Sequence, residues 1–128
     1  MRDLGFTKNW PKLALPKFTT FRFTRKDRDW QVGETVHIVL KPRCRLREVL
    51  GLALITEKEQ RWIHVIDPHD SIPLIGDDEA RDDGFLGRHT MVDWMSRTHK
   101  GRNYEEPMNK LTLRWLTRPK EVLSGNAG

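Results

Sequence analysis

The stretch KFTTFRF, residues 17–23, decides how the rest of the chain is interpreted. Polar and charged side chains alternate in it with large aromatic ones, which is the pattern of a half-buried β-strand. Strand geometry predicts that Thr20 and Arg22 lie on one face and that Phe21 and Phe23 lie on the other. The aromatic face would anchor such a strand, and the polar face would contact either an anionic ligand or solvent.

The length and composition describe one ordinary domain. The chain has 128 residues, enough for a hydrophobic core, and its single cysteine, Cys44, excludes an intramolecular disulfide. No apolar run approaches the roughly 20 residues of a membrane helix, and the first ten residues lack the apolar core of a signal peptide. These features predict a cytoplasmic protein with no membrane partner.

Charge is segregated along the chain. Residues 22–47 hold eight lysines and arginines and three acidic residues, a net charge of +5. Residues 67–83 hold seven acidic residues and one arginine, a net charge of −6. The basic segment predicts an anionic partner such as RNA or a nucleotide, and two solvated faces are the alternative.

Apolar patterning and turn signals predict the elements. Strands are expected at residues 18–24, 35–41, 49–55, 62–66 and 111–116, a polar turn at 57–61, and helices at 77–84 and 88–99, with Asp77 as the first N-cap. Residues 1–16 are expected to be an irregular lead-in or short helix packing on a domain at 17–117, and 118–128 a flexible tail. The predicted fold class is α+β, mainly β: a small barrel of about five to six strands with two helices covering one opening.

Four motifs in this order resemble the ASCH family, a branch of the PUA-like barrel folds. KFTTFR at 17–22 is similar to the family's Lys-x-x-Thr-x-Arg on its first strand, and VGETV at 32–36 resembles its Val-Gly-Asp before the second. Asp83-Gly84-Phe85, followed by a helix with Met91 and Trp94, and the closing strand at 111–116 extend the likeness over about residues 17–117. The chain departs from the pattern at Pro16, where the family usually has glycine.

The resemblance implies a cleft between the first strand, the loop after the second and the helices, used for RNA or a nucleotide-like ligand. A subgroup of the family hydrolyses the acetyl group of N4-acetylcytidine with a lysine, a threonine and a glutamate, and ribonuclease activity also occurs among members. Lys17 and Thr20 match the first two residues, but Thr90 occupies the position of the glutamate. Because an alcohol does not replace a carboxylate as a proton shuttle, we expect binding rather than hydrolysis.

The candidate site residues follow from the strand, the charges and the resemblance. Lys17 and Thr20 are the candidate catalytic residues, with Lys17 as nucleophile or general base. The candidate ligand- or RNA-binding residues are Lys17, Thr20, Arg22, Arg25, Lys26, Arg28, Trp30, Lys41, Arg43, Arg45 and Arg47, the cations for phosphate and Trp30 for stacking on a base.

Each of these candidate site residues also has an ordinary structural explanation. Lys17 could be a solvated lysine, Thr20 a simple strand former, and Arg22 the partner of the acidic helix. The other tryptophans are assigned to the core. No metal-ligand spacing is found, so neither a metal nor a cofactor is expected. A protein-interaction module is a third function, in which the acidic segment 67–83 would bind a basic partner.

Overall fold

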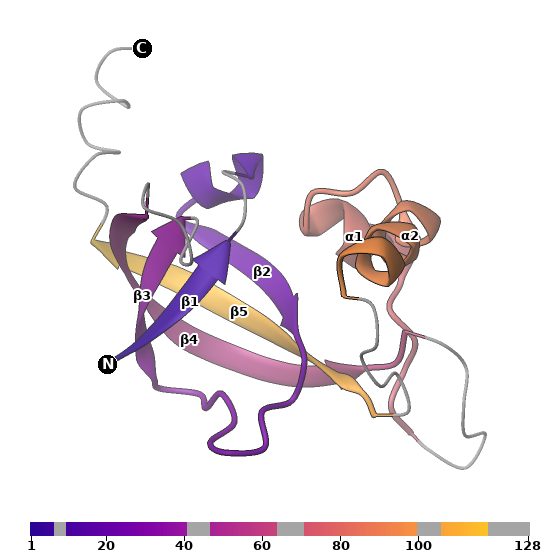
Figure 1. Ribbon diagram of the computed structural model, residues 1–128, viewed down its shortest axis with the longest axis horizontal. Coiled ribbons are helices and arrows are strands. Elements are labelled where there is room, and N and C mark those ends of the chain that lie inside the picture. The colour runs from indigo at the N-terminus through magenta and orange to yellow at the C-terminus, as the bar shows by residue number, and fades with distance from the viewer. Residues whose placement is uncertain (7–9, 41–46, 64–70, 100–105, 118–128) are drawn as a thin grey trace.

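The computed structural model describes residues 1–6, 10–40, 47–63, 71–99 and 106–117. Its elements, in chain order, are β1 (Arg2–Phe6), the 3-10 helix η1 (Pro11–Ala14), β2 (Lys17–Arg22), β3 (Thr35–Leu40), β4 (Glu48–Arg61), α1 (Asp77–Asp82), α2 (Arg88–Thr98) and β5 (Met108–Thr117). Figure 1 shows one curled sheet with both helices grouped beside one of its ends. No helix in the described ranges is long and apolar enough to cross a membrane.

The five strands form a single open sheet in the order β1-β3-β4-β5-β2. β1 runs parallel to β3, and the other neighbours are antiparallel. Although β1 and β2 are the two edge strands, the sheet curls enough to bring their side chains together, with the ring centroids of Phe6 and Phe18 6.2 Å apart. The prediction of a mainly β, α+β domain is confirmed, whereas the described strands do not close into a barrel.

Curling is helped by irregularities in the long strand β4. Its pairing register shifts opposite Ile38 and Val39 of β3, and again against β5 between Ile55 and Glu57. Gly51 lies at the first irregularity with φ +156°, where an added Cβ would lie 2.0 Å from the Thr117 carbonyl oxygen. Only glycine allows this close approach of two backbones, in agreement with the bend expected there.

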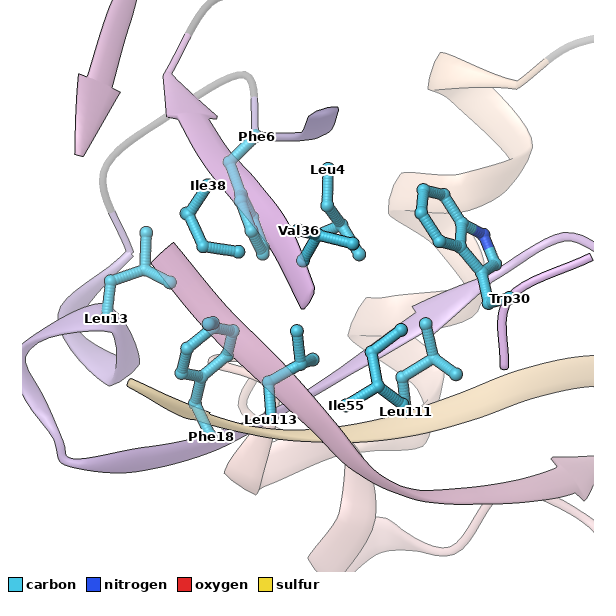
Figure 2. Close-up of a cluster of buried hydrophobic side chains, with 11 residues drawn as sticks. Leu4, Phe6, Leu13, Phe18, Trp30, Val36, Ile38, Ile55, Leu111 and Leu113 are labelled. Atoms are coloured by element: carbon cyan, nitrogen blue, oxygen red, sulfur yellow. The ribbon is translucent and has the colours of Figure 1, made fainter. Parts of the chain in front are cut away.

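The main core lies on the concave side of the sheet. Figure 2 shows its side chains converging from several strands and from η1: Leu4, Phe6, Leu13, Phe18, Trp30, Val36, Ile38, Ile55, Leu111 and Leu113. All are 5 % exposed or less, so this cluster accounts for the largest share of buried apolar surface.

A second cluster attaches the helices to the sheet. It joins Phe21 of β2 and Met108 of β5 to Ala80, Met91 and Met95 of the helices. Since neighbouring strand residues point to opposite faces, Phe21 faces away from the core that contains Phe18. The helices therefore pack against the face of β2 that carries Phe21, and Met91 and Met95 of α2 are buried in this contact.

The turn expected at 57–61 is wrong, and the strand expected at 62–66 is only partly within the described residues. Residues 57–61 do not turn but continue β4, pairing with β5 from Thr112 to Met108. Their polar pattern belongs to a strand whose outward side chains are paired, because Arg61 and Lys110 both contact Glu79 of α1 at 2.9 and 2.7 Å. Trp62 makes only an isolated bridge to Leu74, and residues 64–66 of the strand expected there lie outside the described residues.

The N-terminal segment also differs from expectation. Arg2–Phe6 is not an irregular lead-in but an edge strand, because Leu4 and Phe6 alternate into the main core. The short helix is confirmed as η1. α1 is capped by Gly76 rather than by Asp77, which occupies the first turn with Asp78 and Glu79. The expected tail, 118–128, lies outside the described residues.

Candidate functional site

A cleft of about 870 Å³ opens between the end of β2, the loop that follows it, η1 and the helical layer. This volume lies within the roughly 300–1,000 Å³ typical of small-molecule sites. Aromatic rings make up much of its lining: Phe6, Trp10, Phe21, Phe23, Trp30, Phe85 and Trp94. Charged side chains are interspersed among them: Lys12, Arg22, Arg25, Lys26, Asp27, Asp83 and Glu106.

A buried ion pair lies in this lining. The Lys12 ammonium of η1 contacts the Oδ1 atom of Asp83, which follows α1, and both residues are only 6 % exposed. Lys12 Nζ also donates a hydrogen bond of 2.6 Å to the carbonyl oxygen of Thr19. Burial raises the pKa of Asp83 and lowers the pKa of Lys12, and the attraction between the two charges opposes both shifts.

Asp83 keeps one acceptor for a ligand. Its Oδ1 atom is occupied by Lys12, whereas no described residue donates a hydrogen bond to Oδ2. Oδ2 is also not among the fully enclosed polar atoms that lack a partner. An acceptor that is accessible from the cleft and held on a buried residue is therefore available for binding.

Arg22 supplies the complementary donors. Its guanidinium carbon lies 4.6 Å from the centroid of the Phe6 ring, and its Nε donates to Thr20 Oγ1 at 3.1 Å. Burial lowers the pKa of Arg22 to about 10, although the nearby Asp83 charge acts in the opposite direction. Within the described ranges nothing accepts a hydrogen bond from its two terminal nitrogens, so they remain a donor fork.

Three aromatic rings form a wall beside Asp83. The ring centroids are 5.2 Å apart for Trp10 and Phe85, 5.6 Å for Phe85 and Trp94, and 6.1 Å for Trp10 and Trp94. Gly84 permits this packing, because it has φ +108° and an added Cβ would lie 2.8 Å from the Trp10 ring. The ring planes are inclined to one another by 52° to 79°, so the wall offers apolar ring faces and edges next to the charged groups.

Several candidate residues named from the sequence line this cleft: Thr20, Arg22, Arg25, Lys26 and Trp30. Thr20 and Arg22 share a face of β2, as predicted, and their side chains are hydrogen-bonded. Trp30 is 4 % exposed and belongs to the main core, with the Arg2 guanidinium carbon 4.3 Å from its ring centroid. Its ring is thus largely covered, and Trp10 and Trp94, expected to be core, line the cleft more openly.

Lys17 is not brought together with Thr20. It is exposed and lines a separate hollow with Thr19 and Arg81, because three positions along a strand place two side chains on opposite faces. The candidate catalytic pair therefore does not occupy one site.

The other basic candidates lie elsewhere. Arg28 pairs with Glu34 at 3.6 Å and Arg47 with Asp3 at 2.6 Å, and neither lines the cleft. Lys41, Arg43 and Arg45 lie outside the described residues. Thr90, at the position of the family's glutamate, is exposed on α2 and does not line the cleft either.

Sequence reasoning missed the Lys12–Asp83 pair. Asp83 belongs to the motif Asp83-Gly84-Phe85, but this motif indicated only the end of a helix and gave Asp83 no role in the site. No sequence pattern indicated a functional role for Lys12, because it lies beside Pro11 in a segment expected to be irregular. Within the described residues, no group of three or more His, Cys, Asp or Glu side chains could hold a metal ion.

Comparison with known proteins adds no assignment: neither a family model, nor a curated protein, nor a solved structure matches the chain.

Proposed function

We propose that the protein binds RNA or a nucleotide-like ligand in the cleft lined by Thr20 and Arg22. The observation that carries this proposal is the donor fork of Arg22 beside the wall of Trp10, Phe85 and Trp94. Stacking of a base on an aromatic side chain is worth roughly 1–3 kcal/mol, and arginine binds phosphate or a base edge through two donors.

Further cations extend the site toward solvent. Arg25 and Lys26 follow β2 and line the same cleft. The Arg25 side chain is 44 % exposed, pairs with the exposed Asp27 at 3.2 and 3.3 Å, and has its guanidinium carbon 5.6 Å from the centroid of the Trp30 ring. Such an exposed pair is worth little, so a phosphate group could displace it.

The fold we propose with this function is an ASCH-type, PUA-like barrel in a cytoplasmic protein. The order of sequence motifs supports it, as does a mainly β sheet whose edge strands approach each other at Phe6 and Phe18. The polar face of β2, which carries Thr20 and Arg22, lines the cleft, and this position suits the ligand-binding role that we propose.

Fluorescence anisotropy with a short labelled single-stranded RNA, at two salt concentrations, tests the proposal. We expect the logarithm of the binding constant to fall by about 0.7 per logarithm of salt for each phosphate neutralised. Arg22→Gln should weaken binding about tenfold, whereas Arg97→Gln, an exposed arginine paired with Asp93 on α2, should not. Binding no tighter than that of a charge-matched polyanion, with no salt slope, would refute the proposal.

A second candidate function, hydrolysis of an acylated nucleoside, is favoured by one observation. Lys12, Thr20 and Asp83 line the same cleft and supply a lysine, a threonine and a carboxylate, although not through Lys17. Amide hydrolysis needs a base for the attacking water and an acid for the leaving amine, and the lowered pKa of Lys12 and raised pKa of Asp83 suit those tasks.

Incubation with N4-acetylcytidine and chromatographic detection of cytidine tests this second function. Turnover that Lys12→Met abolishes and Lys17→Met leaves unchanged would support it. Absence of turnover, or turnover that survives Lys12→Met in folded protein, would exclude it.

A further inference from the structure

The cleft presents one acceptor and a pair of donors that no described residue uses. The acceptor is Oδ2 of Asp83, and the donors are the terminal nitrogens of Arg22. Paired with the Lys12 ammonium, the Asp83 carboxylate only accepts hydrogen bonds, and the Arg22 guanidinium only donates them. The ligand must therefore carry an N–H or O–H group beside an acceptor.

Asp83 and Arg22 line the same cleft, and the charge of each shifts the pKa of the other. Asp83 is joined directly to Gly84, against which Trp10 packs, and Asp83, Trp10, Phe85 and Trp94 all line the cleft. Arg22 is held over the Phe6 ring on the side of β2. We infer that a planar base stacked on one ring of the wall presents an edge to both groups.

Every natural nucleobase carries an N–H group next to an acceptor on its Watson–Crick edge. We propose that Asp83 and Arg22 read this edge, so that the cleft takes a single unpaired base whose Watson–Crick N–H group is intact. This inference rests on the proposed nucleotide binding and adds the chemical class of the ligand and the residues that select it.

Because Asp83 is buried, a ligand that lacks the N–H group is expected to bind weakly. In uracil or guanine, a methyl group in place of the ring N–H hydrogen removes the donor and leaves the Asp83 acceptor facing a carbon, without water to replace the lost hydrogen bond. A site built to bond a substrate N–H or O–H rejects an analogue lacking it far more strongly than one differing by a methyl group elsewhere. Base pairing occupies the same edge, so a duplex is excluded as well.

The test compares the binding of two isomeric methylated nucleotides. Intrinsic tryptophan fluorescence of the full chain is titrated with uridine 5′-monophosphate and with its 3-methyl and 5-methyl derivatives. The two methylated nucleotides have the same size, but only the 3-methyl compound lacks the N–H. We expect the 5-methyl compound to bind within about threefold of the parent and the 3-methyl compound at least about tenfold more weakly.

The outcomes separate the two proposals. If the nucleotides bind and the isomers do not differ, edge reading is wrong while nucleotide binding stands. If none of the three binds and RNA shows no salt-dependent binding, both are wrong.

A double variant assigns the discrimination to Asp83. Lys12→Met with Asp83→Leu removes the acceptor without leaving a buried charge unpaired, and it should bring the isomers within about threefold of each other. Asp93→Asn, an exposed carboxylate on α2, is the matched control and should retain the tenfold difference. Because the isomer comparison is made on the native chain, it remains decisive even if the double variant does not fold.

Discussion

Lys12 and Asp83 form an ion pair across 71 positions of the chain, and each residue is 6 % exposed. The pair connects η1 to the residue that follows α1, so it links the edge of the sheet to the helices at the cleft. Removing two charges from water costs roughly as much as their attraction returns, whereas stranding one of them is costly. The pair therefore serves to position groups more than to stabilise the fold.

Lys12→Met should destabilise the protein by about 3–5 kcal/mol at neutral pH, because Asp83 is left buried without a partner. The free energy of unfolding, measured by urea titration, checks this. Lys12→Met combined with Asp83→Leu should recover most of the loss. The exposed Asp93–Arg97 pair provides the control, and Arg97→Met should cost no more than about 0.5 kcal/mol. A double variant as unstable as the single one would contradict this account.

Local patterning allowed much of the sheet to be predicted, and tertiary pairing explains what was missed. The alternation in residues 17–22 and the Met91–Met95 stripe each reflect one face buried against a neighbour, so β2 and α2 could be recognised. Residues 57–61 resembled a turn because their polar side chains have partners remote in sequence, Asp29 for Lys58 and Glu79 for Arg61. β1 was missed because two apolar residues in five give little periodic signal.

Glu34 should make stability depend on pH in acid. It accepts hydrogen bonds from Arg2 Nε and Nη2, both at 2.7 Å, and these bonds lower its pKa below the ordinary value of 4.5. A lowered folded-state pKa means that the stabilisation is complete above about 4.5 and is lost as pH falls through the folded value.

Glu34→Gln should therefore cost about 1–2 kcal/mol at pH 7, and the difference from the native protein should disappear as pH falls from 4.5 toward about 2. Urea titrations at pH 7, 4.5, 3 and 2 measure it. Asp93→Asn, applied at an exposed carboxylate, should show no such convergence. A difference that grows as the pH falls would have the wrong sign and would overturn this role of Glu34.

Gly51→Ala should destabilise the sheet where β4 meets β5. The added Cβ would lie 2.0 Å from the Thr117 carbonyl oxygen, and the φ of +156° is unfavourable for any side chain. We expect a loss of at least about 1–3 kcal/mol in the free energy of unfolding. Gly76→Ala is the matched control, since its Cβ would meet nothing closer than 3.7 Å. Equal losses in the two variants would show that the close approach at Gly51 does not limit stability.

The site was predictable only in part, for a similar reason. The strand rhythm placed Thr20 and Arg22 on one face correctly. Lys17 lies on the other face of the strand because side chains alternate along it. The Lys-x-x-Thr motif therefore grouped Lys17 with Thr20, although the strand places their side chains on opposite faces. Lys12 and Asp83 meet only once η1 and the helices have packed, and neither residue's sequence neighbours reveal that contact.

Gly84→Ala tests whether nucleotide binding depends on the aromatic wall rather than on the main core. With φ +108° and a Cβ 2.8 Å from Trp10, alanine is strained and must displace the indole. The Trp10 and Phe85 ring centroids are 5.2 Å apart, and Trp10 lies at the margin of the main core, so we expect the wall to open with most of the buried cluster around Phe18 retained. We expect a loss of about 1–3 kcal/mol in stability and a nucleotide affinity at least fivefold weaker, measured by urea titration and ligand titration on the same preparation. Gly76→Ala should change neither, since nothing lies near its Cβ except a flexible Glu79 oxygen. If Gly84→Ala lowers stability but leaves the affinity unchanged, the ligand does not stack on Trp10, and the wall belongs to the fold rather than to the site.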